Sequence, residues 1–226
     1  MIRIAAFLAA LACAGVASAQ VAPTAAETAA YRGLFAAAAK GDSEAIARLV
    51  AGGADVKARD GYGRTPLHVA AFARQRDAMR ALAKSGADPN ALERDRYDIV
   101  TIAAVADDVA TLEVALAIGG KATNVTSRYD GTALIAAAHL GHAEVVRTLI
   151  AARAPLDHVN NLGWTALIES IVLGDGGARH LATLQALVDA GANVNLADRN
   201  GLTPLHLAEA NGYREMALVL RAAGGR

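Results

Sequence analysis

The feature that most constrains this chain is a short motif that recurs at a nearly constant interval. The seven residues that begin at Thr65 read TPLHVAA, and the seven that begin at Thr203 read TPLHLAE. Related segments begin at Asp98, Thr132 and Thr165, so the motif starts are separated by 33, 34, 33 and 38 residues. A period of this length indicates one small structural unit repeated along the chain, with stability that comes from stacking of neighbouring units.

A glycine recurs along the chain at the same interval as the motif. The residue 21 positions after a motif start is a glycine in three copies, at Gly86, Gly119 and Gly224. Arg153 takes this place in the copy that begins at Thr132, and in the copy that begins at Thr165 the glycine, Gly191, comes five residues late. Counting back 21 positions from Gly53 places one more copy at Arg32, which makes six repeats. The five extra residues lie around Gly174–Gly177, where we expect a longer turn between two helices of one repeat.

Each copy has the sequence of two short helices. Thr65 and Thr203 are good N-cap residues, and the proline after each suits the first helical position. Hydrophobic residues make up 54% of the chain but aromatic residues only 4%, because the surplus is mostly alanine. Alanine is the best helix former and lets helices approach closely. This composition predicts packed short helices, and argues against intrinsic disorder or a polytopic membrane protein.

These motifs together resemble ankyrin repeats. The resemblance rests on the TPLH starts, the GHAEVV segment at 141–146, the Gly-Ala helix ends and the NVN segment at 193–195. It covers residues 28–226 and implies an all-α solenoid of about six helix-turn-helix repeats with β-hairpin loops along one edge. The sequence departs from the family pattern at Asp98, at Ile135 and Ile168 in place of histidine, and at Arg153.

The first 19 residues are predicted to be a secretory signal peptide. Arg3 is a minimal basic region, an apolar run of about 13 residues follows, and Ala17-Ser18-Ala19 is a small-residue cleavage pattern. The run is shorter than the roughly 20 residues of a membrane-spanning helix. We expect cleavage after Ala19, a linker over residues 20–27, and no membrane insertion afterwards. The only cysteine, Cys13, would leave with the signal, and lipidation there is the less favoured alternative.

No catalytic, metal or cofactor site is predicted. Ser170 lacks the G-x-S-x-G context of a hydrolase nucleophile, and Gly174–Gly177 lacks the residues of a calcium or phosphate loop. His68 and His206 occupy the motif position that the resemblance assigns to structural hydrogen bonds. Four other histidines fall in the fourth and fifth repeats without a recognised zinc spacing: His139, His142, His158 and His180.

The candidate binding residues are those that the repeat itself does not require. The first set lies one to four residues before a motif start, at the expected hairpin tips, and is rich in the Trp, Tyr and Arg typical of binding hot spots. Its members are Tyr62, Arg64, Arg96, Tyr97, Arg128, Tyr129, Trp164 and Arg199, with Arg94 and Leu162 beside them. A second set, seven residues after a start, could line a groove: Phe72, Val105 and Val172. The alternative for the first set is that its side chains cover neighbouring loops, and the alternative for the second set is core packing.

The sequence therefore predicts an exported, non-enzymatic protein-binding module that acts as a monomer. The 22 basic and 22 acidic residues balance, which gives no electrostatic case for nucleic acid. The alanine- and arginine-rich composition and the short signal favour a bacterial periplasm. The alternatives are a small-ligand or metal-binding protein that uses the histidines of repeats four and five, and an immunity or protective factor for an exported enzyme. The sequence does not identify the partner.

Overall fold

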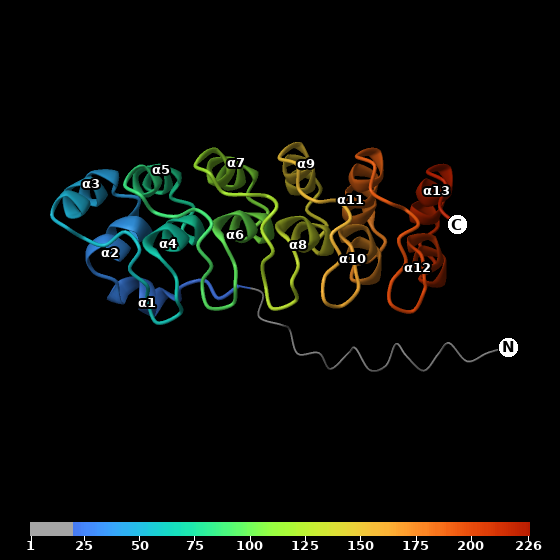
Figure 1. The fold of residues 1–226 in the computed structure, drawn as a ribbon, viewed down its shortest axis with the longest axis horizontal. Coiled ribbons are helices and arrows are strands. Elements are labelled where there is room, and N and C mark those ends of the chain that lie inside the picture. Colours follow the sequence, from blue (N-terminus) through green and yellow to red (C-terminus); the bar gives the residue numbers. More distant parts are fainter. Residues whose placement is uncertain (1–19) are drawn as a thin grey trace.

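The structure is a computed structural model that describes residues 20–226. Six helix pairs follow one another along its long axis (Figure 1). The first helices of the pairs are α2 (Gly33–Lys40), α4 (Pro66–Phe72), α6 (Ile99–Val105), α8 (Ala133–His139), α10 (Ala166–Val172) and α12 (Pro204–Ala210). The second helices are α3 (Ser43–Ala51), α5 (Arg76–Lys84), α7 (Val109–Ala117), α9 (Ala143–Ala151), α11 (Ala178–Asp189) and α13 (Arg214–Ala222). The predicted all-α stack of six repeats is confirmed.

The helices form two layers, and the loops between repeats project on one side. In Figure 1 the first helices lie in one row and the second helices in another, and the loops that lead into α4, α6, α8, α10 and α12 extend below them. Across residues 20–226 these loops contain no β-strand. Their one β-bridge is antiparallel and joins Thr126 to Gly131. The expected hairpins are therefore tight hydrogen-bonded turns rather than paired strands.

The motif residues begin the first helices as predicted. Thr65 and Thr203 are N-caps of α4 and α12, and in both cases a proline is the first helical residue. Asp98 caps α6 through its carboxylate, which accepts from the Thr101 N–H at 2.8 Å. An aspartate here replaces the usual threonine without loss of the cap, because both side chains place an oxygen where it can accept from the first turn.

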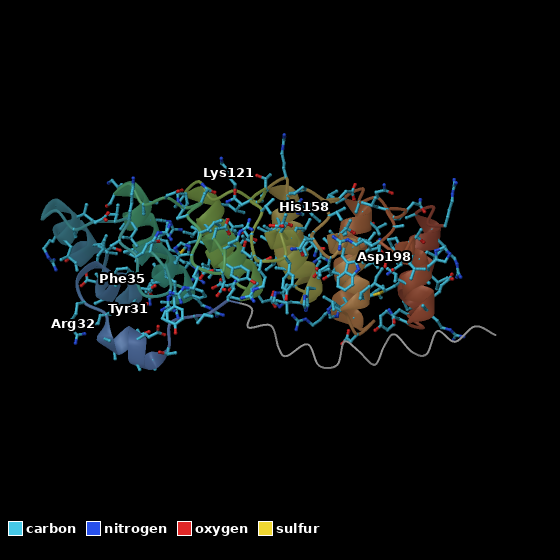
Figure 2. The ribbon with its side chains drawn as sticks, turned by 60° about the horizontal axis from the view of Figure 1, so that its bottom comes forward. Tyr31, Arg32, Phe35, Lys121, His158 and Asp198 are labelled. Carbon is cyan, nitrogen blue, oxygen red and sulfur yellow. The ribbon has the colours of Figure 1, made fainter. Side chains whose placement is uncertain are left out.

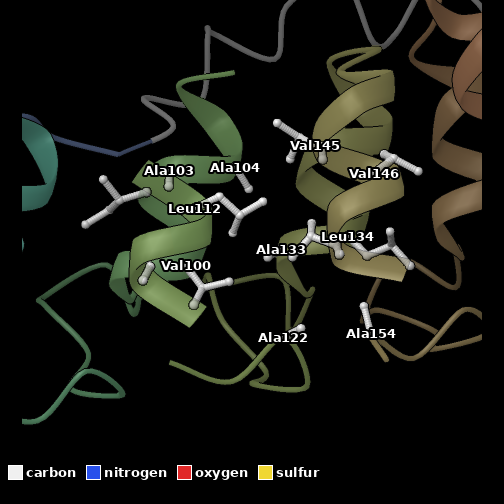
Figure 3. Close-up of a cluster of buried hydrophobic side chains, with 14 of the residues drawn as sticks. Val100, Ala103, Ala104, Leu112, Ala122, Ala133, Leu134, Val145, Val146 and Ala154 are labelled. Carbon is white, nitrogen blue, oxygen red and sulfur yellow. The ribbon is translucent and has the colours of Figure 1, made fainter. Parts of the chain in front are cut away.

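A continuous apolar core runs through the stack. Between the third and fourth repeats, Val100 and Leu112 pack close to Leu134 and Val145, with small alanines filling the spaces between them (Figure 3). All four of these larger side chains are fully buried. Because the core consists of contacts between neighbouring repeats, it holds the loops at a fixed spacing along the edge.

The structure shows two departures from the repeat at the positions that the sequence predicted. The turn between α10 and α11 has five residues where most other repeats have three, and α11 has 12 residues where the other second helices have nine. This accounts for the insertion around Gly174–Gly177. Arg153 has a φ of +61°, the left-handed conformation that glycine adopts at the same position in the other repeats.

The expected linker at residues 20–27 is only partly extended, and it is not detached from the repeats. A short helix, α1 (Ala25–Ala30), begins within it behind a Thr24 capping box. Gln20 donates to the carbonyl of Thr101 at 2.8 Å. The predicted signal peptide lies outside the described residues. Among residues 20–226, no helix has the length and hydrophobicity needed to span a membrane.

Candidate protein-binding edge

The five projecting loops end in tips that we call the hairpin edge: residues 60–64, 93–97, 127–131, 160–164 and 198–202. A side-chain oxygen of the first tip residue stabilises each turn. The carboxylate of Asp60 accepts from the N–H groups of Tyr62 and Arg64, both at 2.9 Å. The same role falls to Glu93, Ser127, Asn160 and Asp198. These residues were not among the predicted site residues, although a polar side chain stands five residues before every motif start.

Neighbouring tips are joined through their backbones. The N–H of Arg94 donates to the carbonyl of Tyr62 at 3.0 Å, and the N–H of Ser127 donates to that of Arg96 at 3.0 Å. Asn161 N–H donates to the carbonyl of Tyr129 at 2.9 Å. The first four tips are thus fixed relative to one another, and little conformational entropy would be lost when a partner binds them.

Exposed apolar side chains lie along this edge. Tyr62 and Tyr129 are each 37% exposed and Leu162 is 39% exposed, and all three stand three residues before a motif start. Leu202, on the last tip, is 41% exposed. Large apolar side chains held in one register on a rigid edge are a feature of protein-binding surfaces.

The arginines of the edge divide into exposed and buried ones. Arg96 pairs with Asp130 at 3.0 Å and Arg128 pairs with Asp95 at 3.1 Å, each across two neighbouring tips. Both side chains remain about half or more exposed. Exposed pairs of this kind contribute roughly 0–1 kcal/mol to stability. These arginines can therefore exchange their partners for those of a bound protein at small cost.

The structure corrects the prediction for Arg64 and qualifies it for three other residues. Arg64 is 1% exposed and holds two carboxylates, one of them from the N-terminal segment, so it is buried rather than exposed at the tip as predicted. Tyr97 and Trp164 are half-buried, which leaves part of each ring to cover its neighbours. The stem of Arg199 crosses Gly163, where an added Cβ would lie 2.4 Å from the Arg199 Cγ.

Arg64 is the centre of a charged cluster that the sequence did not reveal. Its Nε donates to Asp60 at 2.7 Å, and its terminal nitrogens donate to Glu27 at 2.9 Å and to the carbonyl of Val21 at 3.0 Å. Burial would raise the pKa of Asp60, but hydrogen bonds from Tyr31 and Arg64 outweigh it and lower that pKa. Burial raises the pKa of Tyr31, whose hydroxyl donates to Asp60 at 2.6 Å.

The second candidate surface lies at the other end of the first helices. Phe72, Val105 and Val172 are the last residues of α4, α6 and α10, and each is half-buried. The equivalent residue of α8, His139, is exposed and lies 3.4 Å from the carboxylate of buried Glu169. A polar pair therefore interrupts the row, which is not the continuous apolar groove that the sequence suggested.

The histidines of repeats four and five have separate partners. His142 Nδ1 lies 2.9 Å from the carbonyl of Ala104, and His158 Nε2 lies 2.6 Å from that of Asp130. The two ring nitrogens of His180 contact Asp175 and the carbonyl of His139. Within residues 20–226, no three His, Cys, Asp or Glu side chains gather in a way that could hold a metal ion. The geometry thus gives no support to the metal-binding alternative.

The motif histidine of the second repeat has the structural role that the resemblance implies. His68 is 1% exposed, and its Nδ1 accepts from the Thr65 N–H at 3.1 Å. Its Nε2 then carries the proton and faces the carbonyl of Tyr97, on the tip that leads into the third repeat, at 3.2 Å. Burial lowers the pKa of His68 from 6.5 to about 4. This side chain links two repeats in its neutral form.

Comparison with known proteins agrees with the repeat architecture. A family model described as "Ankyrin repeats (3 copies)" matches residues 11–93 and 100–195, and one described as "Ankyrin repeats (many copies)" matches residues 177–221. The ankyrin repeat protein YahD of Escherichia coli K12 is 34% identical over 189 residues, which span 83% of this chain and 94% of YahD. Human ankyrin repeat and SOCS box protein 16 is 30% identical over 193 residues, but these span only 42% of that protein.

Solved structures show the same fold. An ankyrin repeat domain from Acinetobacter baumannii AYE superposes with a TM-score of 0.80 and is 42% identical, with 85% of this chain and 98% of that chain covered. The matched relatives thus share both the repeat sequence and the stacked helix pairs. This chain belongs to the ankyrin-repeat family.

Proposed function

We propose that this chain is an exported, non-enzymatic scaffold that binds a partner protein along its hairpin edge. The observation that carries the proposal is the row of Tyr62, Tyr129 and Leu162, exposed at one register position on tips that are hydrogen-bonded to one another. Ankyrin repeats generally bind proteins. A rigid edge with aromatic and aliphatic side chains beside arginines suits that activity.

The compartment is part of the proposal. The basic residue, the apolar run and the Ala17-Ser18-Ala19 pattern support export to a bacterial periplasm with cleavage after Ala19. The chain that remains has 21 basic and 22 acidic residues and no cysteine, so an oxidising compartment poses no hazard to it.

Site-specific photo-cross-linking in the cells that make the protein tests the binding edge. A photoreactive amino acid replaces Tyr129 in one variant, Leu162 in a second and Leu218 in a third. Leu218, on the second-helix side, is 56% exposed and is the matched control. We expect one protein to be cross-linked from positions 129 and 162 and not from 218. Equal cross-linking from all three positions, or none from the edge, would contradict the proposal.

The identity of the cross-linked protein separates two versions of this function. An exported enzyme that loses activity in the complex would make the chain a protective or immunity factor. A partner without such activity would make it a scaffold. Both versions use the same edge.

A further inference from the structure

The N-terminal segment Gln20–Tyr31 lies against the repeats in the manner of a bound peptide. Its first part is extended, with Val21 and Pro23 half-buried while Ala22 and Thr24 point to solvent. Alternate burial of this kind is that of a strand with one face on a surface. The segment then turns into α1, which lies beside the first hairpin tip (Figure 1).

Contacts with the first repeat, the first hairpin tip and the third repeat hold the segment. Gln20 reaches the Thr101 carbonyl in the third repeat, and Arg64 on the first tip holds both the Val21 carbonyl and the Glu27 carboxylate. Tyr31 donates to Asp60 and stacks on Phe35 of the first repeat, with ring centroids 5.3 Å apart (Figure 2). No residue of α1 is buried, so these few contacts, rather than an apolar core, hold the helix in place.

Arg64 has the geometry of a receptor for a carboxylate. Asp60 fixes the guanidinium from one side at 2.7 Å, and the Tyr62 ring lies against it with its centroid 4.6 Å from the Arg64 Cζ. Its remaining nitrogens face the segment, where they meet one carboxylate and one backbone carbonyl. A planar guanidinium held in this way is suited to recognise a carboxylate that follows an extended stretch of peptide.

We propose that the face around Arg64 is a peptide-binding site whose resident ligand is the chain's own segment Gln20–Tyr31, and that it can accept a partner segment in which an extended stretch is followed by a carboxylate. The tethered segment competes with such a partner, since linkage gives it an effective concentration of roughly millimolar. This site shares Tyr62 with the hairpin edge but includes neither Tyr129 nor Leu162, the positions that test the function proposed above, so the two proposals can fail separately.

Hydrogen exchange of the full chain tests whether the charge of Glu27 holds the segment. We expect Glu27→Lys to raise exchange across residues 20–31 by about tenfold or more, because it replaces attraction to Arg64 by repulsion. The matched control is Glu44→Lys, which also changes a first-turn glutamate but one paired only with exposed Arg48 at 3.9 Å. The control should leave exchange of residues 20–31 unchanged.

A labelled peptide with the sequence of residues 20–31 then tests the site in trans. We expect it to bind the full Glu27→Lys chain at least about tenfold more tightly than the unaltered chain, where the site is filled. The same peptide with Glu27→Gln should bind more weakly, and that replacement keeps a side chain able to complete the capping box. Equal binding to both chains, equal binding of both peptides, or unchanged exchange in Glu27→Lys would overturn the proposal.

Discussion

The buried His68 makes a specific prediction about stability at mildly acidic pH. Its pKa is about 4 in the folded chain and 6.5 when the ring is free in water. Between these values the unfolded chain binds more protons than the folded one. The stability that neutral His68 provides is therefore complete above pH 6.5 and is lost as the pH falls toward 4. Between pH 7 and pH 5 the loss should be about 2 kcal/mol of the free energy of unfolding.

The loss of stability due to His68 occurs at a higher pH than any loss due to the carboxylates. The pKa values of Asp60, Asp108 and Asp175 are lowered from 3.8 by their hydrogen bonds and partner charges, so their contributions persist above that value and fall only at lower pH. Urea denaturation at pH 7 and pH 5, followed by circular dichroism, measures the change. Titration of the histidine rings by NMR locates it.

Two variants complete this test. His68→Gln should lower stability at pH 7, because it removes a buried ring, and should also make the midpoint less dependent on pH. The control is His206→Gln, since His206 holds the same motif position but is exposed. If the His68→Gln variant loses as much free energy of unfolding between pH 7 and pH 5 as the unaltered chain, burial of His68 does not cause the loss. The same conclusion follows if the His68 ring titrates near 6.5.

The other predictions concern the backbone, the core and processing. Arg153→Gly should raise the free energy of unfolding by about 1 kcal/mol, because Arg153 has a φ of +61°; an unchanged urea midpoint would contradict this. Leu134→Ala should lower it by roughly 2–5 kcal/mol in the same assay, since the side chain is fully buried; a loss below about 1 kcal/mol would mean that the core collapses around the gap. Mass analysis of the exported protein should find Gln20 at its N-terminus, and an intact Met1 or a lipid-modified Cys13 would refute the export proposal.

The repeat period accounts for most of the fold that could be predicted from the sequence. Thr65, Asp98 and Thr203 cap helices because capping depends on residues within one turn, and such local signals are visible in sequence. Arg153 could be placed in the left-handed region because the register aligns it with glycines. Each of these features depends on neighbours along the chain or on the period itself.

The site was less predictable because contacts between distant segments decide which of its residues are buried and which are exposed. Arg64 and Arg96 look alike in sequence, yet Arg64 is buried because Glu27, 37 residues upstream, reaches it from a segment outside the repeat register. Trp164 was one of the predicted contact residues, but it is half-buried, whereas its neighbour Leu162 is more exposed. Which face of a loop residue is covered depends on the next repeat, and one sequence does not show this.

The most direct test of the binding edge is a double substitution, Tyr129→Ala with Leu162→Ala, measured for both folding and partner capture. Both side chains are more than a third exposed, so the thermal midpoint should stay close to that of the unaltered chain. Affinity for the protein cross-linked at position 129 should fall on the order of thirtyfold, which corresponds to about 2 kcal/mol at an interface. Leu218→Ala is the control and should change neither quantity. Undiminished capture by the folded double variant would contradict the central claim that this edge binds the partner.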